Sequence, residues 1–146
     1  MSKWINLPDN IEGIFGIVYI IKNKHPDSTK QFYIGAKQLL RKTRLKPTKT
    51  RKRNKIVWRD NGVEEYWGSS KELLDDIVKY GEDYFTKEVI ELCGSKFHMK
   101  YAELVWQIKC KALFDPRFYN GILSVRLSKV PTNFKDVIRD INKLNL

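Results

Sequence analysis

Two short apolar segments near the N-terminus constrain the fold of this chain most strongly. Residues 14–22 are almost continuously apolar and β-branched, and residues 31–35 form a second, shorter segment with the sequence Gln-Phe-Tyr-Ile-Gly. Residues of these types favour β-strands. The polar residues 23–28 separate the two segments. The pattern therefore predicts a β-hairpin with a long loop.

Residues 69–72 are expected to open a helix, because their Ser-Ser-Lys-Glu sequence has the serine-to-glutamate spacing of a capping box. The apolar residues that follow, between positions 73 and 78, share one helical face. Gly81 is a typical residue at the C-terminal end of a helix. The helix should therefore end there.

Three further elements are expected in the second half of the chain. Residues 85–92 alternate sufficiently to predict a third strand, and residues 98–114 predict a broad apolar helix that Asp115-Pro116 ends. Residues 132–144 place their apolar side chains on one stripe, which predicts a final amphipathic helix.

Together these elements predict an α/β domain of the α+β kind, with a small central antiparallel β-sheet of about three strands flanked by helices. The 146 residues are enough for one domain with its own core. We assign residues 1–128 to this domain. Residues 129–146 are expected to form a C-terminal helix that is packed on the domain or appended to it.

The excess positive charge of the chain lies in one basic segment, residues 37–59. This segment contains eleven Lys and Arg residues and no acidic residue, and we expect a loop or an extended arm. The rest of the chain is balanced, although the whole carries a net charge of +11. Concentrated positive charge favours a polyanion, because each neutralised phosphate releases counterions. The segment therefore predicts nucleic-acid binding, against the alternative of a solvated loop without a ligand.

Seven side chains of the basic segment are expected to contact DNA: Lys42, Lys46, Lys49, Arg51, Lys52, Arg53 and Lys55. We expect no membrane contact, because residues 46–51 lack an apolar face and no apolar run reaches the ~18–20 residues that cross a bilayer. The first residues also lack a signal-peptide core. Cys93 and Cys110 have no metal-like spacing, so we expect reduced, buried thiols in a cytoplasm.

Two tyrosines occur on the predicted hairpin. Tyr19 closes the motif Gly-Ile-Val-Tyr on the first strand, and Tyr33 opens the motif Tyr-Ile-Gly on the second, 14 positions later. They can meet across the hairpin because side chains on one face alternate with a period of two. Taken alone, this pair is equally typical of an ordinary strand core.

The order of the motifs along the chain adds information that the tyrosines alone do not give. In sequence the motifs are Gly16 to Tyr19, Tyr33 to Gly35, the cations Lys37, Arg41 and Arg44, the segment Tyr66 to Ser70, the helix acid Glu103, and Tyr119 to Gly121. This order resembles the GIY-YIG nuclease superfamily. It is particularly similar to short phage-encoded proteins related to homing endonucleases, over residues 16–127.

The resemblance implies roles for the residues that match its first two motifs. Tyr19 and Tyr33 correspond to the two motif tyrosines, and Gly35 to the glycine that lets the chain turn out of the strand near the site. The family's catalytic arginine corresponds to Arg41 or Arg44, and the spacing leaves both open. Lys37 follows Tyr33 closely enough to be a further catalytic cation.

The resemblance also implies the metal site. Glu103, the one acid in the predicted helix 98–114, corresponds to the carboxylate that binds a single Mg²⁺ (or Mn²⁺) per active site. Asn120 corresponds to the asparagine near the C-terminal end of the site. Oxygen ligands with retained waters are how Mg²⁺ is normally held. In this scheme Tyr19 relays a proton from water, and because the ordinary pKa of tyrosine is ~10, neighbouring cations have to favour its anion.

The chain departs from the family pattern in three respects. The first motif has one additional residue between its glycine and Tyr19. Many members carry a histidine on the helix after the arginine, whereas the two histidines here, His25 and His98, lie elsewhere. Larger homing enzymes add a DNA-reading domain after the nuclease domain. Target choice should therefore depend on the basic segment, the final helix or a partner.

The resemblance implies a metal-dependent endonuclease that hydrolyses the phosphodiester bonds of double-stranded DNA, by nicking or by cutting both strands. The implied location is the cytoplasm of a phage-infected bacterium. A monomer and a transient dimer on DNA are both left open. Two alternatives remain: a non-catalytic, basic nucleic-acid-binding protein, and a protein whose basic segment docks on an acidic protein surface.

Overall fold

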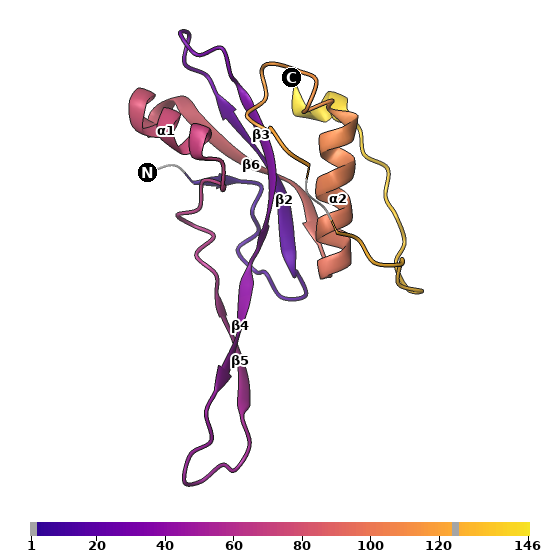
Figure 1. The fold of residues 1–146 in the computed structure, drawn as a ribbon. Coiled ribbons are helices and arrows are strands. Elements are labelled where there is room, and N and C mark those ends of the chain that lie inside the picture. Colours follow the sequence, from indigo (N-terminus) through magenta and orange to yellow (C-terminus); the bar gives the residue numbers. More distant parts are fainter. Residues whose placement is uncertain (1–2, 124–125) are drawn as a thin grey trace.

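The computed structural model describes residues 3–123 and 126–146, and its centre is a four-stranded sheet with the strand order β1-β6-β2-β3 (Figure 1). The strands are β1 (Trp4–Ile5), β2 (Gly16–Asn23), β3 (Phe32–Gln38) and β6 (Phe85–Cys93). β2 pairs antiparallel with both β3 and β6, which confirms the predicted hairpin and the third strand.

The sheet has one more strand than the sequence predicted. β1 pairs parallel to β6, so the sheet is mixed rather than purely antiparallel. Two residues are too few to give a periodic pattern in the sequence. The strand is held instead by Trp4, which is buried and donates a hydrogen bond from its indole nitrogen to the carbonyl of Val63 at 2.6 Å.

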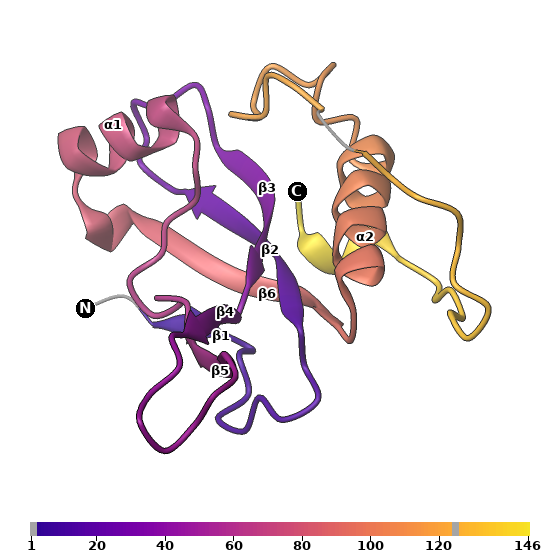
Figure 2. The same cartoon turned by 60° about the horizontal axis from the view of Figure 1, so that its bottom comes forward.

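Helices cover both faces of the sheet, so that β2 is buried on both sides (Figures 1 and 2). Tyr19 and its alternate neighbours on β2 pack with Leu73 of α1 (Lys71–Tyr80). Val18 and Ile20 point to the opposite face and pack with Trp106 of α2 (Lys96–Lys109). This two-sided burial explains the continuous apolar run of the first segment.

The first helix ends at the predicted glycine but begins one residue later than the predicted capping box, because Ser70 and not Ser69 is its N-cap. The side chain of Ser70 accepts a hydrogen bond from the backbone nitrogen of Leu73 at 3.3 Å, as an N-cap does. Gly81 ends the helix with a φ of 98°, in the region that favours glycine. A short 3-10 turn, η1 (Glu82–Tyr84), then leads into β6.

The second helix begins earlier and ends earlier than predicted. Ser95 caps its start by accepting from the backbone nitrogen of His98, and the helix ends at Lys109. Lys111 has a φ of 54°, which interrupts the helical path. Cys110 and Ala112 are buried around this turn, whereas Leu113 and Phe114 are exposed, so core packing explains only part of the apolar character of residues 110–114.

A β-bulge divides β6 into two parts with different orientations. Tyr19 pairs with Val89, but the preceding Val18 pairs with Glu91, which leaves Ile90 without a direct partner on β2. Val89 packs on the α1 side, whereas Ile90 and Glu91 both face α2. An additional residue of this kind reverses the alternation of a strand, and it places the Glu91 carboxylate next to α2.

The basic segment forms an extended arm, one of the two predicted alternatives, and this arm is a β-hairpin rather than irregular chain. β4 (Leu40–Leu45) pairs antiparallel with β5 (Lys55–Asp60), and residues 46–54 connect them; we call residues 40–60 the basic hairpin. It projects from the rest of the domain (Figure 1). The prediction missed it because polar and basic side chains occupy both faces of the two strands, so that no apolar alternation is visible.

The predicted helix over residues 132–144 is wrong. The structure forms a 3-10 turn, η2 (Ile141–Leu144), within an otherwise irregular segment. Ile138, which the predicted apolar stripe placed against the core, is 99% exposed, whereas Arg139 is buried. The guanidinium of Arg139 donates to the Glu91 carboxylate at 2.7 and 2.9 Å. The segment is thus attached to the domain by this buried ion pair, by the buried Leu144 and by Phe134, which packs edge to face on Phe97.

Cys93 and Cys110 are buried free thiols, as the sequence predicts. Neither of the helices in the described ranges is long and apolar enough to cross a bilayer.

Candidate active site

A cleft of about 480 Å³ lies at the outer edge of β3, which is the end strand of the sheet on this side. It brings together three residues that the sequence analysis selected from distant parts of the chain: Tyr33, Glu103 and Asn120. The other lining residues are Ser69, Ser70, Gln107, Tyr119, Gly121 and Ile122. The strand, the start of α1, the middle of α2 and the segment after residue 118 therefore all contribute to one concave site.

Asn120 fixes the wall of the cleft to the edge of the sheet. Its side-chain oxygen accepts from the backbone nitrogen of Ile34 at 3.0 Å, and its side-chain nitrogen donates to the carbonyl of the same residue at 2.8 Å. Gln107 of α2 donates to that carbonyl as well, at 3.0 Å. The asparagine therefore replaces a missing neighbouring strand, and it positions the segment that bears Tyr119 and Gly121.

Glu103 is half-buried on α2 and projects into this cleft. Within the described ranges its carboxylate has neither a hydrogen-bond donor nor a cationic side chain as a partner. Burial raises the pKa of Glu103, because a desolvated carboxylate resists ionisation. A carboxylate that lacks a counter-charge in a concave site suits a divalent cation, which supplies that charge and accepts oxygen ligands. Glu103 is therefore the residue that could hold a metal.

The start of α1 adds an electropositive wall to the cleft. Ser69 and Ser70 both line it, and Ser70 is the N-cap of this ten-residue helix. Backbone N–H groups at a helix start are unpaired within the helix and favour an anion. The hydroxyl of Tyr33 lies 3.3 Å from the Ser69 hydroxyl, with either able to donate. The Tyr33 and Ser69 hydroxyls and the backbone N–H groups at the start of α1 thus lie in the same cleft as Glu103.

The two motif tyrosines meet on one face of the sheet, as predicted. Tyr19 pairs with Gly35 across β2 and β3, and Tyr33 lies diagonally from it, with ring centroids 6.2 Å apart. Tyr33 reaches the cleft, whereas Tyr19 is fully buried behind it.

Gly35 has a different role from the predicted one. It lies inside β3 rather than at a turn that leaves the strand. A Cβ atom at Gly35 would lie 2.5 Å from the Tyr19 hydroxyl oxygen, so any side chain there would displace the ring. A Cβ atom at Gly68, where φ is +93°, would lie 3.3 Å from the same oxygen. The two glycines form a slot for the Tyr19 hydroxyl.

The Tyr19 hydroxyl has no hydrogen-bond partner among the described residues, although it is buried. Burial and the neighbouring Tyr33 raise the pKa of Tyr19 well above its ordinary value. Burial also raises the pKa of Tyr33. Both residues are therefore neutral phenols at physiological pH, and they are suited to donate hydrogen bonds. A proton relay that needs the Tyr19 anion is disfavoured by this environment.

Tyr66 joins the tyrosine pair, which the sequence analysis did not predict. Its ring lies 6.0 Å from that of Tyr19, edge to face, and the Lys37 ammonium lies 4.3 Å from the centre of the Tyr66 ring. Lys87 positions this loop, because its buried ammonium donates to the carbonyls of Glu64 at 2.7 Å and Tyr66 at 3.1 Å. A buried lysine inside an alternating strand gives no sequence signal of this role.

The cations predicted for catalysis do not line the cleft in the described part of the chain. Lys37 remains on the tyrosine side of β3 through its contact with Tyr66. Arg41 and Arg44 are exposed on β4, in the basic hairpin. The residues predicted to bind DNA are all in the same hairpin: Lys42 on β4, Lys55 on β5, and Lys46, Lys49, Arg51, Lys52 and Arg53 in the connecting loop.

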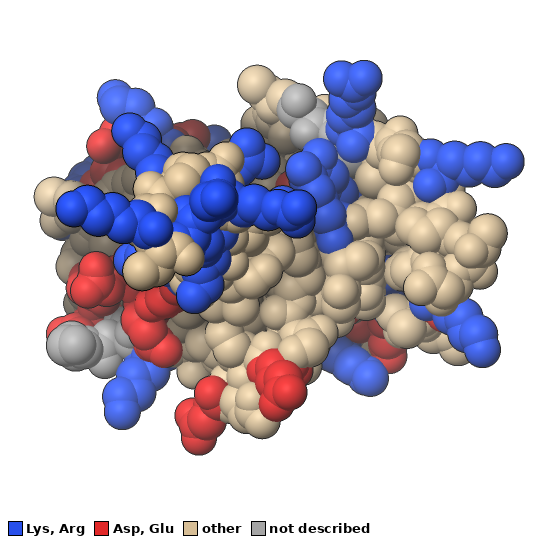
Figure 3. Space-filling model, turned by 90° about the horizontal axis from the view of Figure 1, so that it is seen from below, with Lys and Arg blue, Asp and Glu red and all other residues tan. Residues whose placement is uncertain are grey.

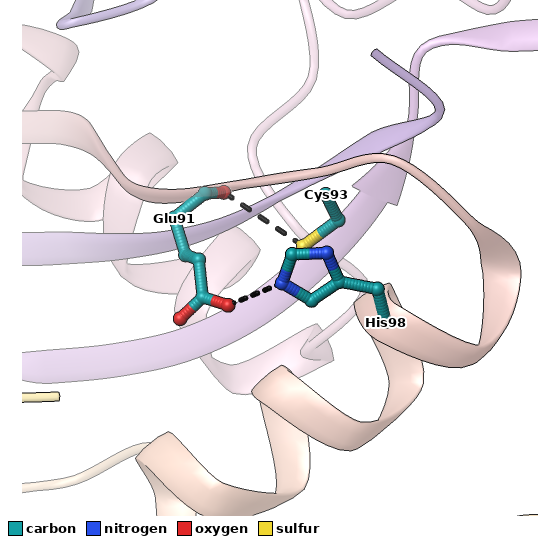
Figure 4. A group of neighbouring side chains, drawn as sticks. All are labelled: Glu91, Cys93 and His98. Atoms are coloured by element: carbon teal, nitrogen blue, oxygen red, sulfur yellow. Dashed lines mark hydrogen bonds and ion pairs between the residues drawn. The ribbon is translucent and has the colours of Figure 1, made fainter. Parts of the chain in front are cut away.

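A second group of metal-ligand types lies on the α2 side of the sheet, where atoms of Glu91, Cys93 and His98 are within 4.8 Å of one another (Figure 4). Their chemistry does not favour a metal. The Glu91 carboxylate accepts from Arg139, His98 and Trp106. Burial raises the pKa of Cys93 to about 12, so the thiol stays protonated. The group therefore connects β6, α2 and the C-terminal segment.

The comparisons with known proteins agree with this geometry. Residues 3–123 match the family model described as "Putative endonuclease segE, GIY-YIG domain". No curated protein and no solved structure matches the chain. The matched range contains the sheet, both helices and the whole cleft up to Ile122.

Proposed function

The chain belongs to the GIY-YIG nuclease superfamily, and on this premise we propose that it is a metal-dependent endonuclease that hydrolyses phosphodiester bonds in double-stranded DNA. One observation carries the proposal. The Glu103 carboxylate is half-buried without a counter-charge, in the same cleft as the Tyr33 hydroxyl and the start of α1. Such a site can hold a cation and a phosphate together.

Glu103 would hold one Mg²⁺ or Mn²⁺ ion. When bound, the ion would act as a Lewis acid toward a phosphate oxygen and offset the negative charge of the transition state. A bound cation would also lower the cost of keeping this half-buried carboxylate ionised.

The remaining residues of the cleft would bind and orient the phosphate. The start of α1 attracts its negative charge, and Tyr33 donates a hydrogen bond to one of its oxygens. As water attacks, its oxygen bonds to phosphorus, the bridging P–O bond breaks, and a proton reaches the departing oxygen. Donors placed before the reaction stabilise the extra charge. Tyr19 and Asn120 are positioning residues in this scheme, because they act through Tyr33 and through β3.

We assign a different place to Arg41 and Arg44. Both are exposed on the basic hairpin, so we propose that they contact the DNA outside the cleft instead of the reacting phosphate. Lys37, on the tyrosine side of β3, adds positive charge closer to the site.

Two finer assignments are also proposals. The order of the motifs between Gly16 and Asn120 supports a relationship to homing endonucleases of phages. The free cysteines Cys93 and Cys110 agree with a reducing compartment, such as the cytoplasm of an infected bacterium. We propose that the protein acts on DNA as a monomer or as a transient dimer.

Cleavage of a supercoiled plasmid tests the proposed function. We expect nicked or linear DNA in the presence of Mg²⁺ or Mn²⁺ and intact plasmid with EDTA. Glu103→Gln should be inactive with either ion while it still binds DNA. Asp75→Asn is a matched control, because Asp75 is an exposed carboxylate on α1 that lies 3.8 Å from Lys71; it should cut like the wild type.

Two results would contradict the proposal. Cleavage by Glu103→Gln at the wild-type rate would show that Glu103 does not hold a metal needed for cleavage. DNA binding by the wild type without cleavage in either ion would favour the non-catalytic, nucleic-acid-binding alternative.

A further inference from the structure

The basic hairpin is a free two-stranded ribbon. β4 and β5 pair with each other from Leu40 opposite Asp60 to Leu45 opposite Lys55, and neither strand joins the four-stranded sheet. Figure 1 shows the hairpin extending away from both helices, and Figure 3 looks onto its tip, where Lys and Arg side chains surround it. The ribbon therefore presents its tip and most of both faces to a partner. At the end nearer the domain, Leu40 and Trp58 line a pocket with residues 11–15 and Gly94.

The charges of this ribbon are not compensated within the protein. It contains ten basic residues and one acidic residue, Asp60. In the described part of the chain, no carboxylate forms an ion pair with any of the ten. Arg41 even lies directly opposite Arg59 in the ladder, and like charges in this arrangement are destabilising. A polyanion would relieve this repulsion.

The two faces of the ribbon differ in composition. One face carries Lys42 opposite Trp58 and Arg44 opposite Ile56. Trp58 is 52% exposed and Ile56 46% exposed. Lysine and arginine pair with guanine edges, and apolar side chains contact the thymine methyl group, in the major groove of DNA. We call these four residues the reading face.

The opposite face offers less to base edges. It carries Thr43 opposite Val57 and Leu45 opposite Lys55. Thr43, Val57 and Leu45 are only partly exposed. The Arg41–Arg59 pair lies at the end of this face that is nearer the domain.

Hydrogen bonds within the tip of the hairpin define its shape. Arg51 donates from its guanidinium to the carbonyls of Lys46 at 2.8 Å and Arg53 at 3.0 Å, and its backbone pairs with Thr48. Three further cations of the tip, Lys49, Lys52 and Arg53, are exposed, as is Lys46 at its base. Arg51 therefore shapes the tip, and the other three are free to contact phosphates.

We propose that the basic hairpin enters the major groove of duplex DNA with its reading face toward the base edges, while Lys49, Lys52 and Arg53 contact the backbone. The strands of a ribbon are about 4.8 Å apart, and a major groove about 12 Å wide admits such a ribbon. This inference rests on the proposed function for its substrate. It adds that the hairpin gives the enzyme its choice of target.

Groove-specific competitors test the proposal. The Glu103→Gln protein, which should bind without cutting, is placed on a labelled duplex of mixed sequence and titrated with methyl green, which occupies the major groove, or netropsin, which occupies the minor groove. For each competitor, the concentration that displaces half of the protein is divided by the Kd of that competitor for DNA. We expect this ratio to be at least about tenfold lower for methyl green than for netropsin. Displacement by netropsin alone would overturn the proposal.

Sequence selection from a random duplex library separates the two parts of the hairpin. In the Glu103→Gln background, Lys42→Gln with Arg44→Gln should change or remove the selected sequence, with a loss of affinity for it of about tenfold or more. Lys49→Gln, Lys52→Gln and Arg53→Gln together should keep the selected sequence and weaken binding to all duplexes alike. Lys24→Gln with Lys135→Gln, two exposed lysines elsewhere, is the control and should change neither.

The outcomes distinguish this proposal from the proposed function. An unchanged selected sequence in the Lys42 and Arg44 variant would overturn the reading face, even if the wild type cleaves DNA normally. Absence of cleavage by the wild type would instead contradict the proposed function. If the whole protein binds anionic phosphatidylserine vesicles through the hairpin and does not bind DNA, the partner of the hairpin is a membrane and the proposal is wrong.

Discussion

The cleft beside β3 and the basic hairpin differ in how far their charged side chains are exposed to water. In the cleft, the carboxylate of Glu103 is partly removed from water and its pKa is raised. In the hairpin, ten basic side chains are concentrated on a projecting ribbon. A desolvated charge interacts strongly with a nearby ion or phosphate, whereas exposed charges act weakly one by one and together bind a polyanion. We infer that cutting and holding DNA are carried by separate regions.

Among the tyrosines of the site, the largest effect on cleavage is expected at Tyr33, and it separates cutting from holding. Its hydroxyl lines the cleft and contacts Ser69. Tyr33→Phe removes this donor and should slow single-turnover cleavage about 100-fold, while the salt dependence of DNA binding stays unchanged. Tyr84→Phe, which alters a tyrosine outside the cleft, is the control. A wild-type rate for Tyr33→Phe would show that the cleft does not contact the reacting phosphate.

A moderate effect is expected on stability at Glu103. Because burial raises the pKa of Glu103, the folded chain retains its proton to a higher pH than the unfolded chain does. The unfavourable contribution of the carboxylate therefore develops as the pH rises above the ordinary value of ~4.3, and it is fully present above the raised pKa. Glu103→Gln should melt at a higher temperature than the wild type at pH 7 without metal. This gain should vanish at about pH 4 and below.

Thermal unfolding at several pH values measures this difference. A neutralised hairpin cation such as Lys49→Gln should show no comparable pH-dependent gain, because Lys49 is exposed. If the melting temperatures of Glu103→Gln and the wild type were the same at every pH, ionised Glu103 would not destabilise the folded protein.

The smallest effect is expected at Tyr19. Its buried hydroxyl has no partner in the described part of the chain, so Tyr19→Phe removes a polar group that is not stabilised by a hydrogen bond. The melting temperature should stay the same or rise slightly. Cleavage should fall less than in Tyr33→Phe, since Tyr19 acts through its neighbour. A larger loss of cleavage than in Tyr33→Phe would make Tyr19 the residue that contacts the substrate.

The sequence predicted the parts of this molecule whose side chains alternate or cap. The β2–β3 hairpin and the start of α1 follow from apolar strands and from Ser70, and both are local signals. The meeting of Tyr33, Glu103 and Asn120 could be expected only from the resemblance, because no local pattern brings residues from a strand, a helix and a loop together.

Other features could not be predicted, for identifiable physical reasons. The bulge at Ile90 reverses the alternation of β6, and the burial of Arg139 contradicts the apolar stripe that predicted a helix. Lys87 is buried because two loop carbonyls accept its hydrogen bonds. Each case depends on a partner that is distant in sequence, and a periodicity argument does not contain this information.

The exposed cations of the hairpin tip allow a direct test of how the hairpin binds DNA. Lys49→Gln, Lys52→Gln and Arg53→Gln remove three exposed cations but keep Arg51, whose hydrogen bonds shape the tip. If each cation contacts one phosphate, the slope of log K against log salt should decrease by about 2 to 3, because each contact contributes about 0.9. Replacing Arg51 as well would disturb the tip and confuse the result.

The central claim is tested by measuring single-turnover cleavage at saturating DNA, together with this salt slope, for the wild type, the triple tip variant and Glu103→Gln. We predict that the tip variant cuts at the wild-type rate with a flattened slope. Glu103→Gln should show the wild-type slope and no cutting. A tip variant that fails to cut even when DNA is saturated, or a Glu103→Gln protein that loses DNA affinity, would contradict the separation of cutting from holding.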